Sequence, residues 1–514
     1  MKFFISGLQA VTLISQGVIL FFALSQAWLA FYYRRSKIRQ TQQVAHPVWQ
    51  GSLPRILVQL PIFNEKYVVE RLLEAVAHLD YPPHLLTIQV LDDSTDDTSE
   101  IAAASIARWS ALGIKIDHVR RGDRCGYKAG ALRAGLALND SEFVTIFDAD
   151  FIPQPRFLKD AIGYFNDPSL GLVQTRWAHL NENASLLTKL LSFAIDCHFS
   201  IEQGGRQATK NFINFNGTAG MWRRKAIDEA GGWQDDCLTE DLDLSFRSQL
   251  RGWKFLFVES ITTPSELPAR MSAIRSQQYR WTKGAAETGR KTLKLLWSSR
   301  QTPGTKIIGS FHMLNSVVFP FLLVLSLVLV PFPFVYGEQM ETAFGAIYAM
   351  MAASLFAMMF TYWTAQSYGD FDGLQKSGPS ILLRAFLFLL MVCGLSVHNS
   401  RAVFQGLLGR RSAFVRTPKF NCDAKGRTNP GTPEYAGEVF KWQNAVEVCL
   451  MLLFTGLMVY SAAHGHVSLV LVYAYFASGY AMVSYFTVSE ILADRMMVKT
   501  SKRELSLHEK QAAE

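Results

Sequence analysis

The sequence predicts an α/β domain with a mainly parallel sheet, joined to a set of membrane-spanning α-helices. Two observations predict this combination. Short apolar runs alternate with helical patterns from about residue 55 to residue 147, and segments long enough to cross a bilayer precede and follow the region that contains them. The composition agrees, because 49% of the 514 residues are hydrophobic and only 18% are charged. This balance excludes a disordered chain and an ordinary cytosolic enzyme.

The first candidate span covers residues 1–35. No charged residue occurs between positions 3 and 33, which exceeds the roughly 20 residues that cross about 30 Å of hydrocarbon. Basic residues follow at once, at Arg34, Arg35, Lys37 and Arg39, and such residues favour the cytoplasmic side. We therefore predict an uncleaved anchor helix, with the chain after it in the cytosol.

The next region, residues 36–300, has no long apolar run and carries the α/β pattern. Strands are predicted at 55–61, 87–91, 114–119 and 143–147, with helices at about 67–79, up to 112, and at 129–138 between them. Strands alternating with helices imply right-handed crossovers and a parallel sheet covered on both faces. Ligands bind such sheets beyond the carboxyl ends of the strands.

Apolar segments return after residue 300. They predict two spans within 301–368, two within 441–494 and a cytosolic tail at 495–514. Between them, the segment 379–440 begins with an apolar stretch that contains Arg384 and continues into a basic loop. A full crossing would move this loop outside, so we predict a helix lying in the interface over 380–408, and five spans in total. Six spans with an outside basic loop is the alternative.

Acidic side chains follow two of the predicted strands. Asp148 and Asp150 come directly after one strand, and Asp92 and Asp93 follow another. Two carboxylates with room for water suit Mg²⁺ or Mn²⁺ holding a diphosphate. Asp92 and Asp93 can accept hydrogen bonds from a nucleoside. A solvated turn is the plainer interpretation of the first pair, and a helix cap is that of the second.

Two further segments carry charged side chains suited to chemistry. Lys128 follows Gly126 at the start of a predicted helix, where backbone N–H groups and an ammonium favour a phosphate; a surface lysine is the alternative. Glu240 and Asp241 lie among leucines in 238–244. A carboxylate in a partly apolar cleft has a raised pKa and can take a proton from a hydroxyl group near neutral pH. We predict Asp241 as this base, with a helix cap as its competing role.

The segment 277–281 places three useful side chains on one helix face. Gln277, Arg280 and Trp281 have the spacing i, i+3, i+4. An arginine can hold a leaving diphosphate, and an indole offers a flat platform for a sugar ring. Anchoring of the domain to lipid by Arg280 and Trp281 is the alternative, since the membrane segments follow closely.

In this order, the motifs resemble the D, D-x-D, T-E-D and Q-x-x-R-W signature of processive family 2 glycosyltransferases, the group of the cellulose, chitin and hyaluronan synthases. The sequence is most similar to cellulose-synthase-like mannan and glucomannan synthases. The resemblance covers residues 55–281 densely and the membrane region more loosely. It implies a GT-A (Rossmann-like) cytosolic glycosyltransferase domain inserted in an α-helical transmembrane domain.

The resemblance implies a divalent cation, Mg²⁺ or Mn²⁺, and inverting transfer of a hexose from UDP-glucose or GDP-mannose to the non-reducing end of a growing β-glycan. It implies secretion of the polymer through the protein's own membrane helices. Residue roles follow by motif: donor binding by Phe63, Glu65, Asp92, Asp93, Lys128, Asp148 and Arg280; metal binding by Asp148 and Asp150; catalysis by Asp241 and Glu240; acceptor binding by Phe215, Asn216, Gly217, Thr218, Gln277 and Trp281.

The segment from Phe414 to Lys419 resembles the F-x-V-T-x-K gating loop of cellulose synthases, with Arg416 in place of the usual Val. Gating roles for Phe414, Thr417 and Lys419 are therefore expected. The extra N-terminal spans and the cyclic-nucleotide-sensing domain of bacterial cellulose synthases are lacking, so regulation by that ligand is not expected.

Three other functions stay open from the sequence. One is transfer of a single sugar to a lipid acceptor, as in ceramide glucosyltransferase, and another is an export channel with an inactive transferase domain. Nucleic-acid binding is the weakest, because the basic residues behind the +8 charge concentrate at span ends. We expect a multi-pass protein of the plasma (inner) membrane, with accessory export subunits allowed for. The sequence leaves the donor, linkage, polymer length and oligomeric state open.

Overall fold

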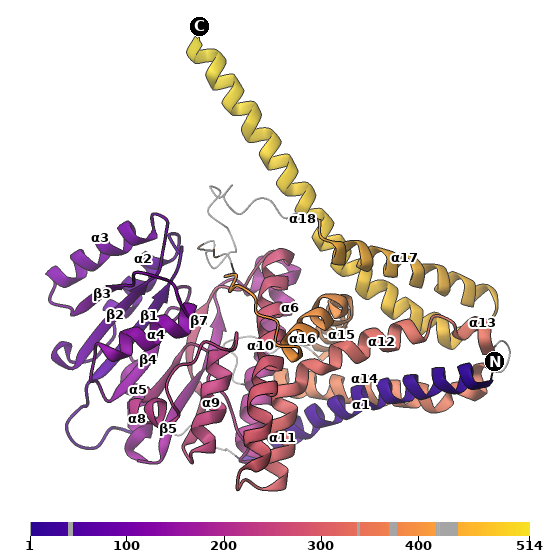
Figure 1. Cartoon of the computed structure of the whole chain (residues 1–514), viewed down its shortest axis with the longest axis horizontal. Helices are drawn as coiled ribbons and strands as arrows, with labels where there is room; N and C mark the ends of the chain where they lie inside the picture. Colours follow the sequence, from indigo (N-terminus) through magenta and orange to yellow (C-terminus); the bar gives the residue numbers. More distant parts are fainter. Residues whose placement is uncertain are drawn as a thin grey trace.

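The computed structural model describes residues 2–39, 45–336, 340–369, 378–417, 419, 421 and 440–513. Of the predicted segment 379–440, residues 418, 420 and 422–439 lie outside the described residues, as do the side chains of the predicted tail beyond residue 496. Figure 1 shows two parts in this chain, a layered sheet domain and a group of long helices, with α10 between them.

The sheet has seven strands in the order β3-β2-β1-β4-β6-β5-β7. Four of the six strand pairings are parallel, which confirms the predicted mainly parallel sheet. Strand β6 departs from it, because it lies antiparallel between β4 and β5. The strands are β1 (Ile56–Ile62), β2 (Leu86–Asp92), β3 (Ile116–Arg120), β4 (Phe143–Ile146), β5 (Leu170–His179), β6 (Gly220–Arg223) and β7 (Lys254–Ser265).

Helices cover both faces of the sheet, because the interior strand β1 contributes apolar side chains to both sides. Ile56, Val58 and Leu60 pack with α2, α3 and α5 on one face, whereas Leu57 packs with α4, α8 and α9 on the other. Alternate residues of a strand point to opposite faces, so a continuous apolar run predicts this three-layer arrangement. These helices are α2 (Val69–Ala77), α3 (Thr98–Ala111), α4 (Tyr127–Ala137), α5 (Phe157–Ile162), α8 (Arg224–Glu229) and α9 (Glu240–Leu250).

A second group of elements connects the sheet to the long helices: α6 (Leu186–Cys197), the π-helix η4 (His198–Gly205), α7 (Arg206–Ala208) and α10 (Met271–Ser298). The 3₁₀ turns are η1 (Pro83–Leu85), η2 (Gly163–Asn166), η3 (Glu182–Ala184) and η5 (Asn315–Val317). The remaining helices are α1 (Lys2–Arg39), α11 (Pro303–Leu314), α12 (Val318–Val328), α13 (Phe332–Tyr336), α14 (Met340–Tyr368), α15 (Gly378–Gly394), α16 (Ser396–Leu407), α17 (Trp442–Ala463) and α18 (Val467–Ala513).

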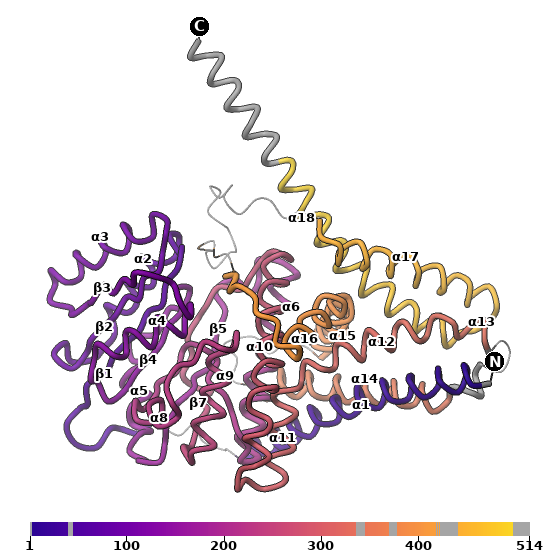
Figure 2. The backbone as a smooth tube through the Cα atoms, viewed as in Figure 1, coloured from indigo at the N-terminus to yellow at the C-terminus, as the bar shows by residue number. Residues whose placement is uncertain are grey.

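Five helices of the described chain are long and apolar enough to cross a membrane. They cover Phe3–Arg39, Pro303–Val335, Gly345–Tyr368, Trp442–Ala463 and Val467–Met496, and a bent pair, α15 with α16, would be a sixth span if it crosses as one unit. Figure 2 lets the eye follow α1 alongside α14, which pack against each other. The five predicted spans and the alternative of six therefore both remain consistent with these helices.

The interfacial helix predicted over 380–408 is not continuous. The chain bends by 58° between α15 and α16, at Leu395. Gly394 explains the close approach here, because a Cβ on it would lie 2.2 Å from the carbonyl oxygen of Gly479 in α18. Arg384 of α15 lies 3.6 Å from Glu182, so this cation is beside the sheet domain.

Helix α10 is joined to the membrane helices by charged side chains. Arg275 makes a buried ion pair of 2.6 Å with Glu447 of α17. One turn earlier, Arg270 pairs with Glu490 at 2.8 Å and with Asp494 at 2.6 Å, both on α18. These pairs set the position of α10 relative to the membrane part.

Substitution of Arg275 by Met should therefore lower the free energy of unfolding by about 3–5 kcal/mol, because it leaves the Glu447 carboxylate buried without its cation. Unfolding of the detergent-solubilised protein, followed by tryptophan fluorescence, measures this loss. Arg156→Met is the matched control, since Arg156 is 71% exposed beside Asp160 and its loss should cost about 1 kcal/mol or less. Equal losses in the two variants would contradict a structural role for the Arg275–Glu447 pair.

Candidate active site

The carboxyl ends of β1, β2 and β4 lie next to one another at one edge of the sheet. Ile62 at the end of β1 is in register with Asp92 at the end of β2, and β4 pairs with β1 on its other side. Asp93 and Asp148 follow these strand ends, as the sequence predicted. The structure therefore brings both acidic motifs to the same edge.

Lys128 joins one of these motifs to a second chain segment. Its Nζ donates to Asp148 Oδ1 at 2.6 Å and to the carbonyl oxygen of Gly217 at 3.0 Å. Burial alone would lower the pKa of Lys128, but the negative charges of Asp148 and Glu240 outweigh it and raise that pKa. Lys128 is thus held as a cation inside an acidic cluster.

Gly217 brings Asp241 to the same place. Its φ of +82° is a left-handed conformation that suits glycine, and a Cβ there would lie 3.1 Å from Asp241 Oδ2 and 3.4 Å from Lys128 Nζ. The other carboxylate oxygen of Asp241 accepts a hydrogen bond of 2.8 Å from the N–H of Leu242. Three segments that are distant in sequence therefore meet around Gly217.

The two acids at the start of α9 are held in an environment that favours their neutral forms. Burial raises the pKa of Asp241 to about 7, and the nearby charge of Glu240 adds to the effect. Burial also raises the pKa of Glu240, against the opposing charge of Lys128. A carboxylate with a pKa near neutrality can accept a proton at physiological pH.

Two more carboxylates are paired with cations from the segment after α16. Lys419 donates to Asp150 Oδ2 at 2.7 Å, and Arg416 donates to Glu65 Oε2 at 2.8 Å. Burial raises the pKa of Glu65 to about 8, although Arg416 and Lys419 oppose this shift. The predicted gating segment therefore lies across the strand ends.

The same segment also contacts α10 and α4. Arg280 donates to Thr417 Oγ1 at 2.7 Å and to the carbonyl oxygen of Val415, and its guanidinium lies 5.1 Å from the ring centre of Phe414. On its other side, Phe414 lies 6.0 Å from the ring of Tyr127. Burial lowers the pKa of Arg280 to about 10, against the charges of Asp148 and Glu240.

The residues predicted to hold a nucleotide fall into two groups. The guanidinium of Arg124 lies 3.3 Å above the ring of Phe63, and Arg121 pairs with Asp93. Asp92 is different, because its buried carboxylate accepts from Ser99 at 2.6 Å and lies 2.9 Å from His118 Nε2. Burial would raise the pKa of Asp92, yet these hydrogen bonds bring it down to about 2. These contacts with neighbouring protein groups indicate that Asp92 stabilises the end of β2 rather than contacting a ligand.

Among known proteins, the family model described as "Glycosyltransferase like family 2" matches residues 54–284. Glucomannan 4-beta-mannosyltransferase 2 of Arabidopsis thaliana is 35% identical over 391 residues, which are 74% of this chain and 70% of that protein. The chain belongs to glycosyltransferase family 2. The predicted resemblance to cellulose-synthase-like mannan and glucomannan synthases is thereby confirmed.

Two further proteins are similar to this family 2 glycosyltransferase. Glucomannan 4-beta-mannosyltransferase 7 of Arabidopsis thaliana is 36% identical over 394 residues, 74% of this chain and 68% of that protein. The solved structure of a Pyrobaculum calidifontis mannosyltransferase with GDP-Man and Mn²⁺ has a TM-score of 0.50 and 20% identity, covering 71% of this chain and 100% of that one. This likeness shows the fold, and confirms the predicted GT-A class.

In this family 2 glycosyltransferase, the predicted acceptor residues 215–218 are mostly internal. Phe215 is fully buried, with its ring 5.6 Å from that of Trp222. Thr218 Oγ1 accepts a hydrogen bond of 2.9 Å from the N–H of Asp148. Their side chains shape the turn that presents Gly217, and direct acceptor contact by Phe215 and Thr218 stays a prediction.

Asn216 is held by residues that the sequence reading missed. Its Oδ1 accepts from Gln203 at 2.9 Å, and its Nδ2 lies 3.2 Å from Nε2 of His198, both residues of the π-helix η4. His198 in turn lies 3.0 Å from a carboxylate oxygen of Glu202. A π-helix carries no clear sequence pattern, although such segments are frequent at functional sites.

The predicted mouth residues lie on α10. Gln277 is buried at 8% exposure, whereas Trp281, one turn later, is 37% exposed. The indole is therefore accessible, while the amide is not. Arg280 between them is the member of this motif that reaches the other site residues.

Asp148 and Asp150 fit a divalent cation, because Mg²⁺ and Mn²⁺ are held by few carboxylates, with water and phosphate oxygens completing the shell. One oxygen of each carboxylate already accepts from a lysine, Lys128 or Lys419. Within the described ranges, no group of three or more His, Cys, Asp or Glu side chains could hold a metal ion. Water or a substrate phosphate would supply the remaining ligands of such a site.

Substitution of Gly217 by Ala should lower transferase activity, because the new methyl group would displace the carboxylate of Asp241 and the ammonium of Lys128. We expect a stability loss of about 1–2 kcal/mol from the left-handed backbone. Gly252→Ala is the matched control, since Gly252 has a φ of +99° and no neighbour within 4 Å of an added Cβ. Sugar transfer and thermal unfolding measure both effects; full activity in Gly217→Ala would contradict the close approach described above.

Proposed function

We propose that the protein is a membrane-embedded inverting β-glycosyltransferase. It transfers a hexose from a nucleotide-diphosphate sugar to the non-reducing end of a growing β-glycan of the glucan or mannan type. The observation that carries the proposal is the meeting of Asp241 with Gly217 and the Lys128–Asp148 pair. The relatives are named 4-beta-mannosyltransferases, which favours mannose over glucose, and GDP-mannose over UDP-glucose as donor.

In this proposal, Asp241 is the general base. Its carboxylate removes the proton of the acceptor hydroxyl while that oxygen bonds to the anomeric carbon, on the face opposite the diphosphate. The bond from the anomeric carbon to the diphosphate oxygen breaks, and the configuration inverts. The proton stays on Asp241 until solvent takes it. Glu240 assists by raising the pKa of its neighbour.

Positive side chains near the strand ends stabilise the leaving diphosphate. Lys128, Arg280 and Lys419 reach this region from α4, α10 and the segment after α16. Fixed charges aimed at the place where charge develops contribute strongly to catalysis. A Mg²⁺ or Mn²⁺ held by Asp148 and Asp150 would supply further positive charge to the diphosphate.

The membrane helices determine on which side of the bilayer we propose that transfer takes place. We place the anchor at 1–35, the catalytic domain at 36–300 in the cytosol, paired spans at 301–368 and 441–494, the interfacial and gating-like region at 379–440 and the tail at 495–514, in the plasma (inner) membrane. The five long apolar helices support this order. The polymer leaves between these helices, starting beside Trp281.

Asp241→Asn should reduce transfer by about 10²–10⁴-fold and leave donor binding unchanged, because the amide cannot take a proton. Incorporation of labelled sugar measures transfer, and calorimetry with the nucleotide diphosphate measures binding. Asp140→Asn, at a side chain 78% exposed, makes the same charge change outside the site and should keep wild-type activity. Turnover retained by Asp241→Asn would remove Asp241 from its role.

The rate should fall as pH drops below about 7. A base must be deprotonated, and the raised pKa of Asp241 places the loss near neutrality, with kcat/KM decreasing about tenfold per pH unit on the acid side. Glu65 is a second acid near the site with a raised pKa. The variant Glu65→Gln removes this group, and its kcat/KM should still fall at low pH. A flat profile from about pH 5 to 8 in the wild type would contradict the assignment.

Product analysis tests processivity and donor choice. Purified protein in lipid nanodiscs is given labelled GDP-mannose or UDP-glucose with Mg²⁺ or Mn²⁺, and linkage-specific glycanases digest the product. We expect a long β-glycan from GDP-mannose. A single added sugar on lipid would favour the ceramide glucosyltransferase-like alternative, and no transfer with any donor would favour an inactive export channel.

A further inference from the structure

The basic end of α1 has two different faces. On one face, Arg34 Nε donates to the hydroxyl of Tyr368 at 2.9 Å, and Lys37 pairs with Glu259 at 2.9 Å. These two cations are engaged by α14 and by β7. They hold the end of the helix against the rest of the protein.

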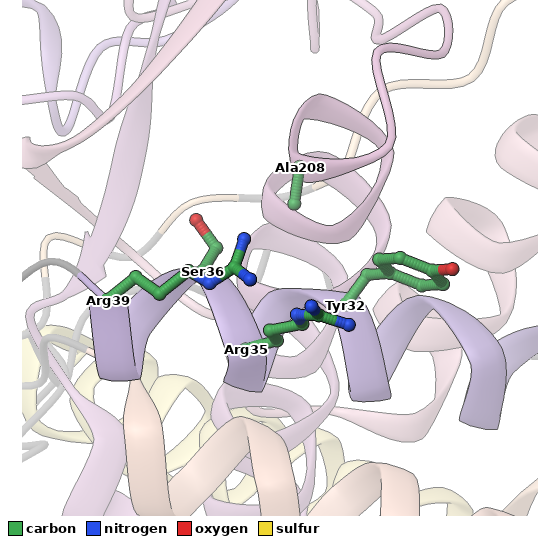
Figure 3. Close-up of a pocket in the computed structure, with 5 residues that line it drawn as sticks. All are labelled: Tyr32, Arg35, Ser36, Arg39 and Ala208. Atoms are coloured by element: carbon green, nitrogen blue, oxygen red, sulfur yellow. The ribbon is translucent and has the colours of Figure 1, made fainter.

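The other face lines a cavity. Tyr32, Arg35, Ser36 and Arg39 have the spacing i, i+3, i+4, i+7, which places them on one side of the helix. With Ala208 of α7 they line a space of about 560 Å³. Figure 3 shows the two arginine side chains extending along α1 toward Tyr32, with Ala208 across the gap. Neither guanidinium has an ion pair or hydrogen bond within the described part of the chain.

An exposed apolar stripe leads to this cavity along the same face of α1. Leu24, Trp28 and Phe31 are 51%, 39% and 50% exposed, and they continue the helical spacing of Arg35 and Arg39 toward the N-terminus. Trp28 also packs with Tyr32, at 4.9 Å between ring centres. Tryptophan and tyrosine prefer the level of the lipid headgroups, and this pair lies next to the cavity.

We propose that this cavity binds the phosphate headgroup of an anionic phospholipid. Two guanidinium groups without protein partners provide forked N–H donors that match phosphate oxygens, and the hydroxyls of Tyr32 and Ser36 add two further donors. The stripe of Leu24, Trp28 and Phe31 receives the acyl chains. A net negative headgroup is preferred, since a zwitterionic one brings its own cation to a site that already has two.

The position of the arginines distinguishes this site from the general excess of basic residues at membrane boundaries. That excess attracts anionic lipid without a defined cavity. Here the cations on one face contact Glu259 and Tyr368 of the protein, while those on the other face line the cavity. The site lies outside the proposed transfer site, so it stands or falls independently of the proposed function.

Ala208→Trp provides the sharpest test, because it narrows the cavity from the α7 side and leaves every positive charge in place. The full-length protein in nanodiscs of phosphatidylcholine takes up fluorescent phosphatidylglycerol, and the affinity is read from energy transfer from the tryptophans, corrected for the added one. We expect Ala208→Trp to weaken uptake about tenfold or more. Unchanged affinity would show that surface charge alone attracts the lipid, and would overturn the proposed cavity.

A double variant, Arg35→Gln with Arg39→Gln, should weaken uptake about thirtyfold. Arg108→Gln with Arg251→Gln is the matched control, with the same change of charge on the sheet domain, and it should bind as the wild type does. If the first double variant fails to insert, Ser36→Glu replaces it, since this change keeps both arginines and gives them an internal counter-ion. Full uptake by Ser36→Glu would contradict the proposal.

Titration with inorganic phosphate separates the two sources of the ligand. We expect phosphate to displace phosphatidylglycerol only at concentrations far above the lipid's own affinity, because phosphate lacks the acyl chains. Equal affinity for inorganic phosphate and for the lipid would assign the cavity to a free phosphate and overturn the lipid proposal.

Discussion

The arrangement at the strand ends depends on acidic side chains that pair with cations from other parts of the chain. Glu65, Asp148 and Asp150 lie close together at the edge of the sheet, where their mutual repulsion and the loss of water would be costly. Arg416, Lys128 and Lys419 supply the compensating charge over distances of 2.6–2.8 Å. Because these cations belong to separate segments, the ion pairs also fix how those segments are arranged.

This constraint explains why the segment after α16 lies where it does. Arg416 and Lys419 are three residues apart, yet they pair with acids that follow two different strands, β1 and β4. A diphosphate would compete with those carboxylates for the same cations. Under the proposed function, a nucleotide sugar bound at the strand ends would therefore change the contacts of this segment.

Much of the site followed from the sequence, because acids placed after buried strands must meet at one edge of a parallel sheet. Asp93 and Asp148 are such residues. The support for Asn216 did not follow, since His198 and Gln203 act through a π-helix that has no apolar periodicity. The sequence does not distinguish a buried side chain from one that contacts a ligand, because the short segment 215–218 contains residues that shape the turn from inside. Phe215 and Thr218 are such residues. The bend at Leu395 depends on contact between Gly394 and Gly479, which are distant in sequence.

Helix α10 has one more consequence. Its 28 residues span about 42 Å without interruption, and ion pairs tie its first turns to α17 and α18, whereas Arg280 and Trp281 lie further along the same rod. A rigid rod transmits rotation along its whole length. A displacement of α17 or α18 that carried Arg270 and Arg275 with it would therefore also displace Arg280 and Trp281, because all four side chains belong to one continuous segment.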